Sequence, residues 1–170
     1  MAKRQLVSEM GVQEQSIWLG NHNFSEDARV RLVDLSRKMT DCPKCETPSK
    51  RHSVGYRYVN EVGLAEPVVL EIRASKHRCT SCKKIFSYPT GYISPPGSQY
   101  TNRVIRTAID LHVEQDMTYR EVCERMLEKY HVDIPLTTIN EWVLAQRAEE
   151  GARVSKIEEE VRKRISEDKE

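Results

Sequence analysis

Two Cys-x-x-Cys pairs, Cys42-Pro-Lys-Cys45 and Cys79-Thr-Ser-Cys82, bracket the stretch of sequence on which the expected fold depends. Each pair places two thiols on one tight turn, which is half of what a tetrahedral ion with four sulfur ligands needs. Residues 46–78 are enough for a β-hairpin that brings the two turns together. We therefore expect one structural Zn²⁺ held by Cys42, Cys45, Cys79 and Cys82, with no open coordination position for catalysis.

Two other uses of paired cysteines fit the sequence less well. A redox Cys-x-x-Cys normally occurs once, at a strand-to-helix turn inside a βαβ pattern, and this sequence shows no such pattern. Disulfides suit secreted chains, whereas the first residues contain no apolar leader segment. His52 and His77 lie close to the pairs, but with four thiolates present we expect them to be solvated or to face phosphate. Cys123 stands apart in a helical pattern and is expected to be a core thiol.

Composition limits the class of protein. The chain has 170 residues, 38% of them hydrophobic and 31% charged, which is enough for one medium domain or two small ones. No run approaches the roughly 20 apolar residues of a membrane span. Thiols kept free for a metal indicate a reducing compartment, so we expect a cytoplasmic, intracellular protein.

Charge is distributed unevenly along the chain, although the net charge is only +1. Residues 42–84 contain nine Lys/Arg and four Asp/Glu, a net charge of +5. Residues 100–147 contain six Lys/Arg and eight Asp/Glu, a net charge of −2. The basic surface is therefore expected on the cysteine-containing part of the chain.

The cysteine-containing part, residues 41–89, is predicted to be a zinc ribbon. Residues 53–59, 68–73 and 84–88 are rich in strand formers and predict three short strands. So few apolar residues cannot form a sufficient core, so the metal is expected to supply folding free energy. Basic side chains surround the second cysteine turn and fit either a solvated loop or a set of phosphate contacts; they are Lys76, Arg78, Lys83 and Lys84.

Residues 90–99 are rich in Pro, Gly and Ser and predict a linker, after which the hydrophobic period becomes helical. Helices are expected at about 101–115, 119–130 and 136–149, with Thr118 and Glu121 forming a capping box. Over residues 100–147 this pattern is typical of a helix-turn-helix domain, whose last helix enters the major groove of DNA.

The helix-turn-helix interpretation assigns DNA contacts. The expected base contacts are the outward positions of the last helix: Leu136, Thr137, Asn140, Glu141 and Leu144. The expected phosphate contacts add four arginines to the basic residues of the second cysteine turn: Arg103, Arg106, Arg120 and Arg147. The net acidity of the segment favours the other possibility, a three-helix bundle used for protein contacts.

The two ends of the chain carry weaker patterns. Residues 1–40 are expected to be an N-terminal extension with one helix at about 25–39, built on Ala28, Val30, Val33 and Leu35; residues 1–24 show too little pattern to assign. Residues 148–170 predict a charged C-terminal helix with an apolar stripe formed by Val154, Ile157, Val161 and Ile165. This stripe fits either a homodimer contact or a single helix that rests on the preceding bundle.

The order of these motifs resembles the N-terminal part of DDE-type insertion-sequence transposases. The resemblance rests on Cys42-Pro-Lys-Cys45, Arg78-Cys79-Thr-Ser-Cys82-Lys-Lys-Ile-Phe86, Tyr119-Arg-Glu-Val122 and Thr138-Ile-Asn-Glu-Trp-Val143. In that family a zinc ribbon precedes a helix-turn-helix, and the two recognise the terminal inverted repeats of the element. The catalytic domain of the family needs ~100 or more residues, and the segment after Arg147 is far shorter. The resemblance therefore implies the DNA-binding portion alone.

The sequence contains no catalytic set, since it has neither a Gly-rich phosphate loop nor a Ser elbow, so no enzyme activity and no small-molecule substrate are expected.

The expected fold class is α+β: a small zinc ribbon of short antiparallel strands, then a three-helix helix-turn-helix domain and a C-terminal helix. The expected function is zinc-dependent, sequence-specific binding of double-stranded DNA, in transposition or in transcription regulation, with a nucleoid location when bound. The alternative is a zinc-ribbon adaptor that docks on a larger nucleic-acid machine such as a polymerase. A third, weaker possibility is binding of single strands through the aromatic side chains Tyr56, Tyr58 and Phe86.

Overall fold

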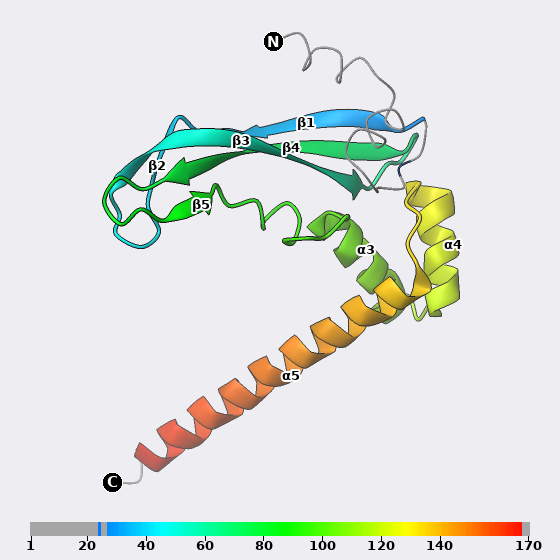
Figure 1. The fold of residues 1–170 in the computed structure, drawn as a ribbon. Helices are drawn as coiled ribbons and strands as arrows, with labels where there is room; N and C mark the ends of the chain where they lie inside the picture. Colours follow the sequence, from blue (N-terminus) through cyan, green and yellow to red (C-terminus); the bar gives the residue numbers. More distant parts are fainter. Residues whose placement is uncertain (1–23, 25–26, 168–170) are drawn as a thin grey trace.

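The computed structural model describes residue 24 and residues 27–167, which form one mixed β-sheet and three helices (Figure 1). The strands are β1 (Arg29–Leu35), β2 (Met39–Asp41), β3 (Pro48–Glu61), β4 (Val68–Arg78) and β5 (Ile85–Ser87). The helices are α3 (Asn102–Val113), α4 (Tyr119–Tyr130) and α5 (Leu136–Glu167). The sheet is an arched layer, α4 lies at one of its ends, α3 lies below the sheet toward the same end, and α5 projects away from them (Figure 1).

β4 is the central strand of the sheet. It is antiparallel to β3 from Arg51↔His77 to Glu61↔Val68, and parallel to β1 from Arg29↔Val68 to Leu35↔Ala74. β5 pairs with the far end of β4, and β2 pairs with the start of β3. The strand order is therefore β1-β4-β3-β2, with β5 beside β4.

Both faces of the sheet are covered near the helical end. Successive residues of a strand point to opposite faces, so Val69 lies on one face and Val68, Leu70 and Ile72 lie on the other. Val69 packs with Phe24 and Tyr58, whereas the opposite cluster contains Val59 and is covered by Ile93. The first five residues of β4 are all buried, as a strand covered on both faces requires.

The helix expected at about 25–39 is wrong, because residues 29–35 form β1. The first two residues of the expected helix, 25 and 26, lie outside the described residues. Val30 and Val33 are β-branched and fit a pleated surface better than a helix. All seven residues of β1 pair with β4. Pairing with a strand that is distant in sequence overrides a weak helical pattern.

The expected fold class, a small ribbon followed by a separate helix-turn-helix domain, is also wrong. β3 has 14 residues and β4 has 11, far more than the short strands of a ribbon, and β1 adds a parallel pair. β3 and β4 both continue through polar sequence. Ser49 on β3 and Ser75 and His77 on β4 are fully buried, so these polar residues belong to the inner face of the strands. Polar composition at these positions therefore does not mark the end of a strand.

The three helices begin where the sequence predicts. Thr101 accepts a hydrogen bond from the Val104 backbone at the start of α3. The capping box of Thr118 and Glu121 at the start of α4 is confirmed, with both of its hydrogen bonds present. The helices share one apolar core; its fully buried members include Val104, Val122, Met126, Ile139 and Val143.

The separate C-terminal helix expected from residue 148 does not exist, because α5 runs without a break from Leu136 to Glu167. Gly151 does not interrupt the helix, because a single helical glycine costs only about 1 kcal/mol. Val154, Ile157 and Val161 are exposed, and the side chain of Ile165 lies outside the described residues. The homodimer expected through this stripe stays a prediction.

Residues 89–100, called the strap below, connect β5 to α3 and include the expected linker. The Arg57 guanidinium donates hydrogen bonds to the carbonyl oxygens of Pro95 (2.8 Å) and Ser94 (3.0 Å). Ser94 is fully buried, and its hydroxyl donates to the Tyr100 carbonyl at 2.7 Å. The strap has little regular secondary structure, but these bonds fix its path along β3.

The helices are joined to the sheet at the β3–β4 connection. Val62 belongs to the helical core, and the backbone N–H of Gly63 donates to the Tyr130 carbonyl at 3.1 Å. Thr101 and Asn60 bond through their backbones at 3.1 Å, which ties the start of α3 to β3. The sheet and helices are therefore held together by backbone bonds as well as by apolar contact.

We predict that Gly63→Ala will destabilise the protein by about 1–3 kcal/mol, the usual cost of overpacking a filled site. A Cβ at position 63 would lie 1.9 Å from the Glu66 carbonyl oxygen, a backbone atom that cannot move aside without disrupting the turn. Urea unfolding measures the change. Gly91→Ala is the matched control, because a Cβ there meets nothing within 4 Å. Equal stability of the two variants would contradict this account of the turn.

Candidate metal centre and interaction surfaces

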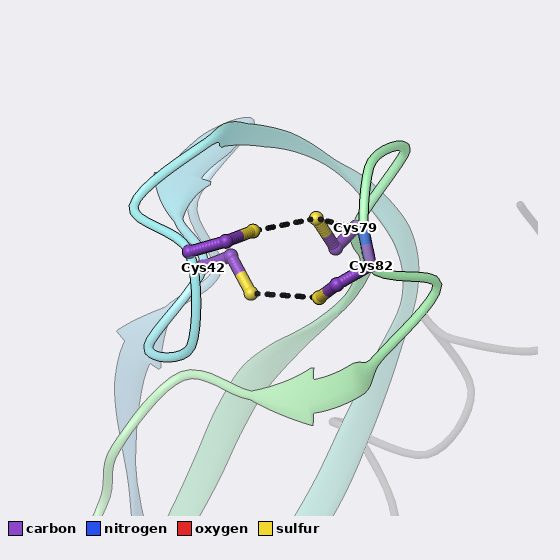
Figure 2. Close-up of side chains that lie close together, drawn as sticks. Cys42, Cys79 and Cys82 are labelled. Carbon is purple, nitrogen blue, oxygen red and sulfur yellow. Dashed lines mark hydrogen bonds between the residues drawn. The ribbon is translucent and has the colours of Figure 1, made fainter.

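The two cysteine turns face each other at the end of the sheet away from α4 (Figures 1 and 2). The Sγ atom of Cys42 lies 3.5 Å from that of Cys82, and the Sγ atom of Cys45 lies 3.5 Å from that of Cys79. All four sulfur atoms lie within 4.8 Å of one another. The predicted ligand set is thus brought together from two turns that are distant in sequence.

The two turns have the same backbone geometry. In the first turn the N–H of Cys42 donates to the Thr47 carbonyl at 3.1 Å; in the second the N–H of Cys79 donates to the Lys84 carbonyl at 2.9 Å. The residue after the second cysteine has a positive φ in both turns, 55° at Glu46 and 61° at Lys83. This conformation is unfavourable for residues with a Cβ, so it needs support from the surrounding structure.

Local hydrogen bonds perturb three of the thiols. Hydrogen bonding with the Thr47 side chain and backbone lowers the pKa of Cys45 to about 6. The backbone N–H of Cys82 lowers the pKa of Cys79. A hydrogen bond from the Lys84 backbone lowers the pKa of Cys82, but burial and the neighbouring thiols outweigh it and raise that pKa to about 11. Each turn therefore contributes one thiol whose anionic form is favoured by its own turn.

His77 is an internal support for the cysteine end of the sheet. It is fully buried, with Nδ1 3.1 Å from the Ser49 carbonyl and Nε2 2.7 Å from the Ser75 hydroxyl. Its ring stacks on Phe86, with centroids 5.5 Å apart. The expectation that His77 is solvated or faces phosphate is therefore wrong, whereas His52 is exposed.

The basic residues predicted to contact phosphate lie in two separate places. Those of the second cysteine turn are exposed at the far end of β4 and in the turn that follows: Lys76, Arg78, Lys83 and Lys84. The other four are exposed on the helices: Arg103, Arg106, Arg120 and Arg147. The cysteine end and α4 lie at opposite ends of the sheet (Figure 1), so Arg120 on α4 does not share a surface with the residues of the second cysteine turn.

The residues predicted to contact bases lie in the first three turns of α5. Leu136, Thr137, Glu141 and Leu144 are exposed, and Asn140 is half-buried. Their side chains point away from the face that carries Ile139 and Val143 into the helical core. The structure thus places these five residues together on one outward helix face.

A groove runs between the strap, α3 and α5 and has a volume of about 870 Å³. Ile105, Ile109 and Trp142 provide its apolar side chains. Its charged side chains carry both signs and belong to Arg103, Arg106, Asp110, Glu149, Glu150 and Arg153. A surface that combines apolar and charged side chains is typical of a protein interface.

Residues 97–168 match the model of the Ras association (RalGDS/AF-6) domain family. The match covers less than half of the 170 residues; it begins in the strap and contains α3, α4 and α5, whereas the sheet precedes it. Neither a curated protein nor a solved structure matches the chain.

This match overturns the predicted family and partner. The segment that was interpreted as a helix-turn-helix is similar to a Ras association domain, not to a transposase DNA-binding region. A mixed sheet of five strands with three helices fits the ubiquitin-like fold of that domain class, and not a ribbon followed by a helix-turn-helix. The predictions of double-stranded DNA as partner, and of a role in transposition or transcription regulation, are therefore wrong.

One polar group of the sheet escaped the sequence analysis. Glu71 is only 5% exposed and forms an ion pair with Arg73, with Nε and Oε1 2.6 Å apart. Burial and the nearby Glu71 carboxylate raise the pKa of Tyr58 to about 12. The signal was present in the sequence, because one acid within the apolar run 68–72 predicts a buried charge that needs a partner on its own face.

The described helices include none that is long and apolar enough to cross a membrane.

We predict that His77→Ala will destabilise the protein by about 1–3 kcal/mol, because the buried Ser75 hydroxyl and Ser49 carbonyl each lose a hydrogen-bond partner. Urea unfolding of the full chain measures the change. His52→Ala is the control, because His52 is exposed on the same strand hairpin. If both variants unfold at the same urea concentration, His77 does not support this end of the sheet.

Proposed function

We propose that this protein is a protein-interaction adaptor whose helical part, α3 to α5, binds a small GTPase. The similarity of residues 97–168 to Ras association domains is the observation that carries the proposal. Small GTPases such as Ras and Ral are the partners of that domain class. The proposed role is binding rather than catalysis, which agrees with the adaptor alternative drawn from the sequence, although with a different partner.

The groove between the strap, α3 and α5 is the proposed contact surface. It is concave, it lies mostly within the matched residues, and Ile105 and Trp142 supply apolar area to it. Arg103 and Arg106 also line it and are exposed on α3. Trp and Arg are the residue types that most often dominate the energy of a protein interface.

The groove is also structurally supported. Tyr100 packs edge-on against Trp142 with ring centroids 5.2 Å apart, and its hydroxyl donates to the Asp133 carbonyl at 3.1 Å. Arg57 fixes the strap from the side of the sheet. A preformed surface loses less conformational entropy on binding, which favours affinity.

We expect the full chain to bind Ras or Ral, and Ala145→Trp to weaken that binding about tenfold or more, a loss of about 1.4 kcal/mol. Ala145 lines the groove and is exposed, so a tryptophan there occupies the groove without entering the helical core. Calorimetry with Ras and Ral, each loaded with GDP or with a non-hydrolysable GTP analogue, measures the affinity. We expect tighter binding to the GTP-analogue state, since the γ-phosphate orders the switch segments of a GTPase.

Ala148→Trp is the matched control, because Ala148 is exposed one turn further along α5 and does not line the groove. It should leave the affinity unchanged. If neither GTPase binds in either nucleotide state, the proposed function fails. If both tryptophan variants bind as the unaltered chain does, the partner is retained but the groove is not its site.

A further inference from the structure

We propose that Cys42, Cys45, Cys79 and Cys82 bind one structural Zn²⁺, which joins the β2–β3 turn to the β4–β5 turn and holds the cysteine end of the sheet closed. The proposal does not rest on the GTPase partner, because it is argued from the two cysteine turns alone; these lie at the end of the sheet away from α4 (Figure 1).

The arrangement of the sulfur atoms fits a tetrahedral ion. Four thiolates about 2.3 Å from a central Zn²⁺ lie about 3.8 Å from one another. The two shortest cross-turn separations are 3.5 Å and all four sulfur atoms lie within 4.8 Å, so small adjustments suffice. The close pairs connect one turn to the other, as Figure 2 shows for Cys42 and Cys82.

Apolar burial does not account for the whole cluster, because Cys42 and Cys79 are buried whereas Cys82 is only partly buried and Cys45 is exposed. None of the four belongs to an apolar cluster of the described residues, whereas Cys123 packs against the helical core. Cys45 is exposed, which is unusual for a cysteine that serves as a small apolar side chain. A shared ligand explains why all four thiols meet, including the exposed one.

The backbone of both turns is built for this purpose. Each turn is closed by the same hydrogen bond from its first cysteine and carries a residue with positive φ after its second cysteine. The backbone N–H of Cys82 also lies 3.4 Å from the Sγ atom of Cys79 and points to it, which favours a thiolate ligand. Two equivalent strained turns that face each other form a preorganised ligand pair.

The charge of the loaded site accounts for the basic residues around it. One Zn²⁺ with four thiolates has a net charge of −2, because the ligand protons are released on binding. Lys44 in the first turn, and Lys83 and Lys84 in the second, are exposed and can offset this charge. The Lys83 ammonium also donates to the Thr80 carbonyl at 2.6 Å within its own turn.

The metal supplies the stability that β2 and β5 lack. Each of these strands has three residues and pairs with only one neighbour. With all four positions taken by thiolates, the ion has no place for a substrate or an activated water, so its role is structural.

The test uses the full chain, purified under reducing conditions without chelator. Native mass spectrometry should find one zinc per chain. Cys42→Ser and Cys79→Ser should each weaken zinc binding by more than about 100-fold, beyond the usual loss from changes outside the ligand sphere. Cys123→Ser is the matched control and should bind zinc as the unaltered chain does.

Hydrogen exchange gives a second measurement that does not depend on the variants. Removal of zinc by a chelator should accelerate exchange in residues 39–49 and 79–88 and leave residues 102–147 unchanged. GTPase binding measured on the untreated, zinc-loaded chain tests the proposed function separately, because neither the zinc stoichiometry nor the exchange measurement requires a GTPase.

Four results would overturn the proposal: a chain with reduced thiols that takes up no zinc, a bound iron ion in place of zinc, two disulfides in the purified chain, or equal zinc loss in Cys123→Ser and Cys42→Ser.

Discussion

β3 and β4 pair along ten residue positions of a single hairpin, and every other described part of the chain is attached to it. β1 and β5 pair with one edge of β4, β2 pairs with β3, and the strap is bonded to β3. The turn of the hairpin reaches the helical core through Val62 and Gly63, and its open end carries the cysteine turns. Two different constraints thus act at its two ends: apolar packing at one, and the gathered thiols at the other.

The sequence predicted the structure best where the spacing of a few residues fits one local arrangement. Thr118 and Glu121 predicted the start of α4 because a capping box satisfies backbone donors that have no partner within the helix itself. The gathering of the four cysteines was predicted for a similar reason, from their spacing on two turns. The course of β1 and the length of β3 could not be predicted, because both depend on β4, a partner distant in sequence. Local patterns carry no information on such a partner.

The interpretation of the basic residues failed for a physical reason. Charge counted along the sequence predicts a basic segment, but binding DNA needs basic groups on one surface. Here Lys83 and Lys84 lie at one end of the sheet and Arg120 lies on α4 beyond the other. The residues expected on the outward side of α5 do lie on its outward side. The side of a helix that faces outward does not determine what binds there, and the match to Ras association domains replaces DNA with a protein partner. The groove was missed altogether, since the strap that forms one of its walls had been predicted to be only a linker.

α5 has 32 residues, which makes it about 48 Å long at 1.5 Å per residue. Its first half is fixed in the helical core by Ile139 and Val143, while residues 151–164 are exposed throughout. A helix held at one end and free at the other acts as a rigid spacer. A molecule attached near residue 164 would be kept about 16 Å from Arg153, the last α5 residue that lines the groove, in a direction determined by the packing of α3 and α4. The chain therefore sets a distance and an angle between two attachments, which a flexible tail of the same length could not do.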